Sequence, residues 1–403
     1  MIVWYVLLLI MSTTALADYM NNRGRSRINS VSIFMIAVMA ILVGMRGEMG
    51  LDTASYIRNF NQITPFLSFS QLYKDSSAFR WEPLYVFSIS IFRHGIDSYN
   101  SFIFVQAVIV LIVVSKSLKR IGLPINAGLY YFFLTFYLHL FEQQRMAVVY
   151  AILLLASTYI ATGDLKKFLL SVLVAAMYQY TALLFLPAYW ITKAPLFRTL
   201  NSKTLRTMRT SPSVITLRDG YNPVVKQSDV QTLFTVSFLI AAAVAVLVSG
   251  FQFSGVLGVI AERVGPSLPP LRTLTYYIDR VSTARNNRAE TLSMARGIIG
   301  HSFVLIVLFV QRKYWCDSKT INWFFLYLVG LVVALVTRDF VWISHRFFSM
   351  YRIGLVLLFS TLIKNEPVRF PYTAATLWCI GIYEFLMMIT RTIGPFRAVI
   401  LSV

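Results

Sequence analysis

The sequence predicts an all-α, polytopic integral membrane protein with about 10–12 transmembrane helices and with candidate re-entrant segments. Three observations predict this fold class. The 403 residues are 57% hydrophobic and only 13% charged, apolar runs recur along the whole chain, and these runs lack the alternation that a membrane β-barrel requires. A soluble domain of this length would need more polar surface to cover its core. We therefore expect residues 1–403 to form a single membrane domain.

About a dozen apolar segments approach the roughly 20 residues that cross a bilayer. They are residues 2–17, 31–45, 83–92, 101–115, 127–141, 146–161, 168–191, 230–250, 297–310, 321–336, 347–363 and 372–389. The first segment has no basic region before it, so we expect it to be retained and not cleaved as a signal peptide. Twelve spans result if every segment crosses.

Ten spans result if residues 83–92 and 168–191 enter the bilayer and return. The first of these segments is short, and the second is interrupted at Gln179, with Pro187 beyond. Irregular backbone at membrane depth must be covered by protein or by a water-filled cavity, so such breaks often mark sites. We favour this second topology because it puts every basic cluster on the cytoplasmic side.

The charge distribution predicts the orientation. The chain has 37 basic and 17 acidic residues, a net charge of +20. In a membrane protein such an excess follows the positive-inside rule, so we expect no nucleic-acid partner and place residues 23–27, 193–229 and 312–319 in the cytoplasm. Both termini and the two long loops, residues 46–82 and 251–296, then lie outside. The first of these loops holds four basic and four acidic residues, and this mixture predicts a binding surface.

Several kinds of chemistry have no sequence support. The chain has no phosphate-binding P-loop, no dinucleotide-binding glycine motif and no paired-histidine zinc motif. The only two cysteines, Cys316 and Cys379, are far apart, and the four histidines are scattered. We therefore expect no cofactor and no metal.

Arginine is the main candidate functional side chain. Arg145 interrupts an apolar run, and Arg338, Arg346 and Arg352 crowd the entrance of a late helix, where Arg338, His345 and Arg352 share a face if the helix is continuous. Because charged groups near the membrane interior are costly, they are functional candidates. A guanidinium group matches phosphate oxygens with a planar fork, so converging arginines predict a site for a multivalent anion such as a diphosphate.

Each single arginine also has a structural interpretation. Arg145 could pair with Glu142, one turn before it, and Arg338 could pair with Asp339. The side chains could also extend toward the polar edge of the bilayer. For the whole set of arginines, we favour anion binding.

Few acidic residues on the outer side could act as a general base. Asp52 and Glu82 flank the first loop, whereas Asp279 and Glu290 lie in the second. Each has an arginine close in sequence, which stabilises the charged form, favours an electrostatic role and weakens the acid as a base. For Asp279 and Glu290 we favour structural pairing.

Three short motifs follow one another in the first half of the chain. Residues 46–60 contain Arg46 followed by Gly-Leu-Asp-Thr at 50–53, then Tyr56. Residues 81–85 have the sequence Trp-Glu-Pro-Leu-Tyr, and residues 144–147 have Gln-Arg-Met-Ala. In order and spacing, these motifs resemble the bacterial Wzy-type polysaccharide polymerases, in particular the EpsG-like branch. The resemblance covers the first half well, the late arginine-rich helix more loosely, and residues 193–296 not at all.

The resemblance implies a GT-C-like membrane fold and a glycosyl transfer without metal or nucleotide at the periplasmic face of the bacterial inner membrane. Undecaprenyl-diphosphate-linked oligosaccharides are the implied donor and acceptor, and membrane lipid, a chain-length regulator and a flippase are the implied partners. The polymer would be O-antigen, capsule or exopolysaccharide. The family's usual histidine is replaced by Gln179, so a hydrogen-bonding role is implied there and not proton transfer.

The charge pattern and the resemblance together indicate three groups of site residues. The catalytic candidates are Asp52, Glu82 and Arg145. The diphosphate-binding candidates are Arg46, Arg145, Arg280, Arg338, Arg346 and Arg352. The sugar-binding candidates are Tyr56, Arg80, Trp81, Tyr85, Gln144 and Gln179. The aromatic members of the last group could instead belong to the interfacial belt of a membrane protein.

Two other functions use similar residues. A ligase would move finished polymer onto the lipid A core, and a flippase or transporter of lipid-linked oligosaccharide would bind the diphosphate without reacting. Transporters often have repeat symmetry between their halves, and this sequence shows none, which favours an enzyme.

Overall fold

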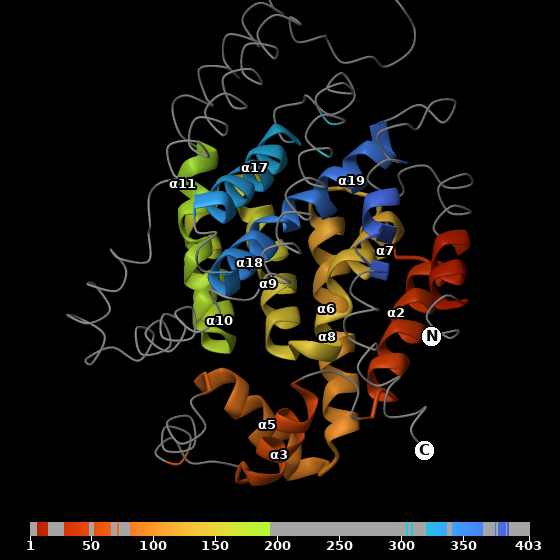
Figure 1. Ribbon diagram of the computed structural model, residues 1–403, viewed down its shortest axis with the longest axis vertical. Coiled ribbons are helices and arrows are strands. Elements are labelled where there is room, and N and C mark those ends of the chain that lie inside the picture. Colours follow the sequence, from red (N-terminus) through yellow and green to blue (C-terminus); the bar gives the residue numbers. More distant parts are fainter. Residues whose placement is uncertain are drawn as a thin grey trace, which may run out of the picture. The chain divides into compact units, whose positions relative to one another are not determined.

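The structure is a computed structural model with two compact units, shown in Figure 1. Unit 1 contains Met1–Leu186 and Ile353–Val403, and unit 2 contains Pro187–Arg352. The structure describes residues 6–14, 28–47, 52–65, 71, 81–193, 304, 308, 320–336, 341–365, 375, 378–383 and 385–386. Within these residues the regular elements are helices and no strand is present, as the sequence predicts.

The main described helices are spread over both units. Those of unit 1 are α2 (Ser30–Gly44), α3 (Thr53–Gln62), α5 (Pro83–Gly95), α6 (Tyr99–Arg120), α7 (Ile125–Phe136), α8 (His139–Glu142), α9 (Gln144–Thr162), α10 (Leu165–Tyr178), the 3-10 helix η1 (Tyr180–Phe185) and α19 (Ile353–Asn365). Those of unit 2 are α11 (Pro187–Lys193), α17 (Thr320–Val336) and α18 (Val341–Tyr351).

Two long apolar helices, α6 and α9, form the centre of unit 1. They have 22 and 19 residues and pack against each other, with α2 on α6 and α10 on α9. At about 1.5 Å per residue, α9 rises about 28 Å, close to the thickness of a hydrocarbon core. Both helices are therefore long and apolar enough to cross a membrane.

A tight turn connects α9 to α10. Gly163 has a φ of 76°, and its N–H donates to the carbonyl of Ile160, so it closes α9 in the left-handed conformation that glycine adopts at low cost. The next residue, Asp164, caps α10 by accepting a hydrogen bond from the N–H of Lys167, 3.1 Å away. The two helices consequently run antiparallel, and α10 leads the chain back toward the start of α9.

Helix α7 is the core helix of unit 1, because each of its twelve residues is buried. It packs against α2, α6 and α19. Gly128 permits this close approach, since a Cβ atom there would lie 2.8 Å from the hydroxyl oxygen of Ser360 on α19. A helix that is apolar on all sides belongs in an interior, which is where the structure places it.

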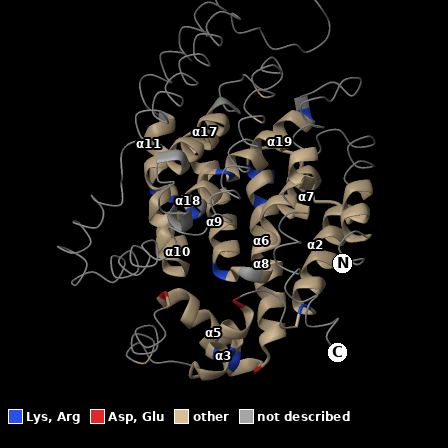
Figure 2. Ribbon diagram, viewed as in Figure 1, with Lys and Arg blue, Asp and Glu red and all other residues tan. Residues whose placement is uncertain are grey.

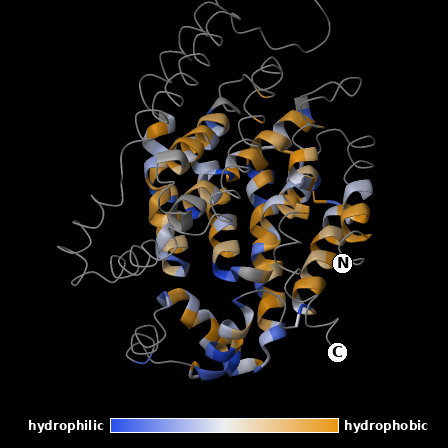
Figure 3. Ribbon diagram, in the orientation of Figure 1, coloured by the Kyte–Doolittle hydropathy of each residue, from blue (hydrophilic) through white to orange (hydrophobic). Residues whose placement is uncertain are grey.

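Helices α3 and α5 lie together at one end of unit 1, beyond the start of α9 (Figure 1). Figure 3 shows that α3 is largely hydrophilic, in contrast to the orange helices α2 and α6. Only Thr53, Tyr56 and Phe60 of α3 are buried, at the spacing of one helical face. Acidic residues of unit 1 gather at this same end (Figure 2).

In unit 2, α17 packs against both α11 and α18. Helix α17 consists almost entirely of apolar residues, and those from Trp323 to Leu328 are all buried. On α18, Tyr351 stacks on Phe347 with an interplanar angle of 7°. Between the two helices, the ring centroids of Tyr327 on α17 and Phe348 on α18 lie 6.1 Å apart, so aromatic contacts contribute to their packing.

The described helices confirm a polytopic, all-α membrane protein. Tyr99–Arg120, Gln144–Thr162 and Arg346–Lys364 are long and apolar enough to cross a membrane, and four further apolar helices are shorter. The helix break predicted at Gln179 is present, between α10 and η1. The loops at residues 193–229 and 251–296 lie outside the described residues, apart from Lys193. The number of spans, the re-entrant segments and the GT-C-like arrangement stay predictions.

Candidate active site

An ion pair between Arg145 and Glu82 forms the centre of the candidate site. Arg145 lies in the first turn of α9, and Glu82 immediately precedes Pro83, the first residue of α5. Arg145 Nη1 lies 2.5 Å from Glu82 Oε2, and the two side chains are 17% and 6% exposed. Both residues were predicted from the sequence, with Glu142 as the possible structural partner of Arg145. The structure pairs Arg145 with Glu82.

The second carboxylate oxygen of Glu82 also has a partner. Glu82 Oε1 accepts a hydrogen bond of 3.1 Å from the backbone N–H of Tyr180, the first residue of η1. That N–H is available because the extended conformation of Gln179 separates η1 from α10. The break at Gln179 therefore provides the donor that helps to hold Glu82 in place.

Gln179 itself is buried, with 5% of its surface exposed. Its backbone N–H donates to the carbonyl of Ala175, and its own carbonyl accepts a hydrogen bond from Ala182. Both backbone groups of this buried residue are thus hydrogen-bonded, which avoids the cost of an unpaired buried polar group. The predicted sugar-binding role of the Gln179 side chain stays a prediction.

Three aromatic side chains surround the Arg145 guanidinium. Its Cζ atom lies 5.8, 5.5 and 5.6 Å from the ring centroids of Tyr56, Trp81 and Tyr85. These rings also contact one another, with centroids 5.1 Å apart for Trp81 and Tyr85 and 5.7 Å apart for Tyr56 and Trp81. Three predicted sugar-binding residues therefore form one cage around the predicted catalytic arginine, held by cation–π contacts.

A second polar network is connected to these rings through the hydrogen bond between Gln144 and Tyr85. The Gln144 side chain donates to the Tyr85 hydroxyl and accepts hydrogen bonds from the Tyr99 hydroxyl, at 3.0 Å, and from Arg46 Nη2, at 3.2 Å. Arg46 Nη2 also lies 2.6 Å from the Tyr99 hydroxyl, and Arg46 Nη1 donates to the carbonyl of Leu140. The network connects the loop after α2 to the rings around Arg145.

Arg46, a predicted diphosphate ligand, is only 2% exposed. Its guanidinium lies 5.7 Å from the centroid of Tyr99 and 5.8 Å from that of Phe141. Burying a charge is costly unless hydrogen bonds and nearby π-electrons compensate for the lost water. These contacts indicate that Arg46 supports Gln144 from the interior.

Asp52 is the residue before α3, at the N-terminal end of that helix. It is exposed, and its backbone carbonyl accepts a hydrogen bond from the N–H of Tyr56, one turn later. Residues four apart lie on the same side of a helix, so Asp52 and Tyr56 project from neighbouring positions on α3. Of the candidate acids that the structure describes, Asp52 is the more accessible.

The structure does not test the other predicted diphosphate ligands or the predicted sugar ligand Arg80. Arg80, Arg280 and Arg338 lie outside the described residues. Arg346 and Arg352 belong to unit 2, where Arg346 is half-buried in α18 and Arg352 follows that helix with 9% exposed. Their convergence with Arg145 on one diphosphate stays a prediction.

The described residues include no group of three or more His, Cys, Asp or Glu side chains placed to hold a metal ion. The cluster offers one arginine, one carboxylate paired with it, and aromatic and amide side chains. Aromatic rings stack on sugar faces, and a guanidinium binds phosphate oxygens. The arrangement suits a ligand that combines sugar with an anionic group.

The match to known proteins agrees with this geometry. Residues 30–202 match the EpsG family. This confirms the predicted relationship, because EpsG-like proteins are Wzy-type polysaccharide polymerases. The matched range begins with α2 and includes Arg46, Glu82 and Arg145. The EpsG match thus indicates a polysaccharide polymerase-like membrane enzyme. No curated protein and no solved structure matches the chain.

Two residues of the candidate site were not predicted from the sequence. Tyr99, the first residue of α6, joins Arg46 to Gln144, and the backbone N–H of Tyr180 holds Glu82. Tyr180 carries a partial signal, because it follows the predicted break at Gln179. For Tyr99 the sequence has no comparable signal, since its hydroxyl meets the site only through helix packing.

Proposed function

We propose that this EpsG-like chain joins polyprenyl-diphosphate-linked oligosaccharide units into a polysaccharide at the periplasmic face of the bacterial inner membrane. The observation that carries the proposal is the Arg145 guanidinium, oriented by Glu82 and enclosed by Tyr56, Trp81 and Tyr85. A fixed cation beside aromatic rings fits a substrate in which a sugar adjoins a diphosphate.

The proposed reaction is a displacement at the anomeric carbon of the growing chain. A hydroxyl oxygen of the next lipid-linked unit bonds to this carbon, and the bond to the diphosphate oxygen breaks. Undecaprenyl diphosphate leaves with the electron pair, and the hydroxyl proton passes to a carboxylate. Both substrates are lipid-linked, which explains why the site is built on membrane helices.

In this proposal Arg145 stabilises the charge that develops on the leaving diphosphate. A preorganised cation at a low-dielectric edge is effective because it needs no reorganisation during the reaction. Glu82 orients Arg145, since its two oxygens accept from Arg145 and from the N–H of Tyr180. The predicted contribution of Arg346 or Arg352 to diphosphate binding stays a prediction.

Asp52 is our choice as the general base. It is exposed and lies one turn before Tyr56, whereas Glu82 is only 4% exposed. A base must reach the proton that it removes, and this condition favours the accessible acid. Tyr56, Trp81 and Tyr85 stack on the sugars, with Arg80, Gln144 and Gln179 as hydrogen-bonding partners.

The deciding experiment is a deletion strain in which surface glycan length is measured by gel electrophoresis. Loss of a polymerase leaves single repeat units on the surface lipid. Loss of a ligase leaves polymer that is not attached to the core, and loss of a flippase leaves units on the cytoplasmic face. Long-chain glycan in the deletion strain would refute the proposal.

The roles of the two acids are separated by complementing that strain. Asp52→Asn should abolish long chains if Asp52 is the base, and Asp164→Asn serves as the control because Asp164 caps α10 at the opposite end of α9. Immunoblots of the membrane fraction report protein abundance. Normal chain length with Asp52→Asn would exclude Asp52 as the base.

A further inference from the structure

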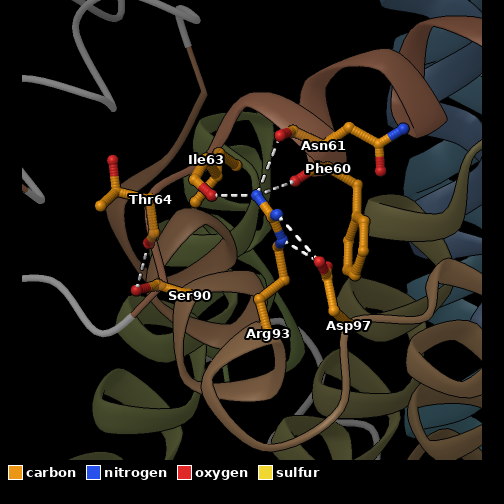
Figure 4. A network of polar contacts seen from close by, with 7 residues as sticks. All are labelled: Phe60, Asn61, Ile63, Thr64, Ser90, Arg93 and Asp97. Atoms are coloured by element: carbon orange, nitrogen blue, oxygen red, sulfur yellow. Dashed lines mark hydrogen bonds and ion pairs between the residues drawn. The ribbon is translucent and has the colours of Figure 1, made fainter.

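Helix α3, which carries Tyr56, is held at both of its ends. At its start, the Thr53 hydroxyl donates a 3.2 Å hydrogen bond to the carbonyl of Phe141 in α8. In its middle, Tyr56 faces the Arg145 guanidinium. At its end, the backbone meets Arg93 of α5 (Figure 4). The position of Tyr56 thus depends on two attachments.

Arg93 binds the C-terminal end of α3 with one nitrogen. Arg93 Nη1 donates to the carbonyls of Phe60 and Asn61, both at 3.0 Å, and to the carbonyl of Ile63 (Figure 4). The last carbonyls of a helix have no N–H partner within it and carry partial negative charge. A guanidinium satisfies both their hydrogen-bonding capacity and their charge.

Asp97 holds Arg93 in this position. Arg93 Nε lies 2.7 Å from Asp97 Oδ1, and Nη2 lies 3.2 Å from Oδ2, a two-pronged contact that sets the plane of the guanidinium. The hydrogen bond from Arg93 lowers the pKa of Asp97 below its usual value. The carboxylate is therefore ionised at neutral pH and pairs there with the Arg93 guanidinium.

Further contacts join the same two helices. The Arg93 Cζ atom lies 5.5 Å from the ring centroid of buried Phe60, and the Ser90 hydroxyl donates to the carbonyl of Thr64 at 2.9 Å. Helix α5 thus starts beside Glu82 in the candidate site and ends with Arg93 on α3. Helix α5 therefore connects the Arg145–Glu82 ion pair to the contact between Arg93 and the C-terminal end of α3.

We infer that Arg93 is a positioning residue, which holds the C-terminal end of α3 so that Tyr56 lies against Arg145. This inference rests on the proposed function, because Tyr56 is proposed to bind sugar. Arg93 acts through α3 and touches no substrate. Its loss should lower the polymerisation rate through Tyr56, while the Arg145–Glu82 pair stays intact.

The first test measures hydrogen–deuterium exchange of the full chain in detergent micelles. Arg93→Gln should raise amide exchange in residues 53–62, and Arg93→Lys should restore part of the protection because it keeps the cation. Asp164→Asn is the matched control, since Asp164 pairs with Lys167 at 2.7 Å on a different helix. Unchanged exchange in α3 with Arg93→Gln would overturn the inference.

The second test asks whether Arg93 acts through Tyr56. Membrane vesicles that contain each variant receive lipid-linked repeat units extracted from the deletion strain, and the initial polymerisation rate is measured per amount of protein. Arg93→Gln should lower the rate about fivefold in the native chain but less than about twofold in a Tyr56→Ala background. Arg93→Lys should recover part of the native rate.

Equal losses in both backgrounds would overturn the inference, because Arg93 would then act independently of Tyr56. A native rate with Arg93→Gln would overturn it as well. Asp97→Asn, which leaves the carbonyl contacts of Arg93 in place, should show a smaller loss than Arg93→Gln. Failure of the proposed function is distinguishable, since the deletion strain would then retain long-chain glycan.

Discussion

Arg145 and Glu82 are 63 residues apart in the sequence, yet their side chains form a largely buried ion pair. The pair joins the start of α9 to the start of α5. Because two charges are withdrawn from water together, each depends on the other for compensation. Removing either charge should therefore affect both the stability and the activity of the protein.

Replacing Arg145 should abolish polymerisation. Arg145→Ala removes the proposed stabiliser of the leaving diphosphate, and we expect the rate to fall by about 100-fold or more. Arg145→Lys keeps the charge but loses the planar fork, so it should recover only a small part of the rate. Vesicle assays with lipid-linked repeat units measure both variants. A native rate for Arg145→Ala would remove this residue from the mechanism.

Removing only the carboxylate should destabilise the protein. Glu82→Ala leaves the Arg145 charge buried without its partner, which typically costs about 3–5 kcal/mol. Thermal unfolding in detergent should show a lower Tm for Glu82→Ala than for native protein. The double variant Glu82→Ala with Arg145→Met removes both charges and should recover part of the loss. Equal Tm values for the single and double variants would contradict the expected coupling.

The backbone contact to Glu82 can be tested by comparing two substitutions at one position. Tyr180→Pro removes the N–H that donates to Glu82, whereas Tyr180→Ala removes the side chain and keeps that N–H. Proline is compatible with the first position of a helix, and Gln179 before it is already extended. We expect Tyr180→Pro to shorten surface glycan much more than Tyr180→Ala. Equal glycan lengths would show that this hydrogen bond is dispensable.

The buried Arg46 should matter more for stability than an exposed arginine nearby. Arg46→Ala removes the side-chain donor to the Leu140 carbonyl and one of the two donors to the Gln144 oxygen, and a buried group left unsatisfied costs about 1–3 kcal/mol. Arg58→Ala is the control, because Arg58 is exposed on α3. Unfolding temperatures in detergent should fall for Arg46→Ala alone. A similar fall for both variants would contradict the buried network.

The sequence contains direct signals for much of this site. Arg145 is conspicuous because it interrupts an apolar run, Gln179 because it breaks another, and Glu82 because it precedes a proline that starts a helix. These signals are local, since the cost of a charge or an irregular backbone in an apolar segment depends on that segment. The cage residues Tyr56, Trp81 and Tyr85 were found through the spacing of family motifs.

Other parts of the site have no such local signal. Helix packing places Arg46 in the interior next to Tyr99, which the sequence does not signal, and the predicted role of Arg46 in ligand binding stays a prediction. The attachment of α3 by Arg93 and Asp97 was also missed, because an arginine four residues before an aspartate is common on helix surfaces. Neither contact can be recognised before the rotation of each helix about its axis is known.

By itself, the sequence determined that the chain is an all-α membrane protein and that residues 30–202 resemble the EpsG family, because apolar length and motif spacing are properties of the chain alone. Only the tertiary structure decided that Glu82 is the partner of Arg145 and that the N–H of Tyr180 is a second hydrogen-bond donor to Glu82. These contacts join residues far apart in sequence. Antiparallel packing of α9 and α10 brings the break at Gln179 back to the start of α9, and α10 also packs against α5, which begins just after Glu82.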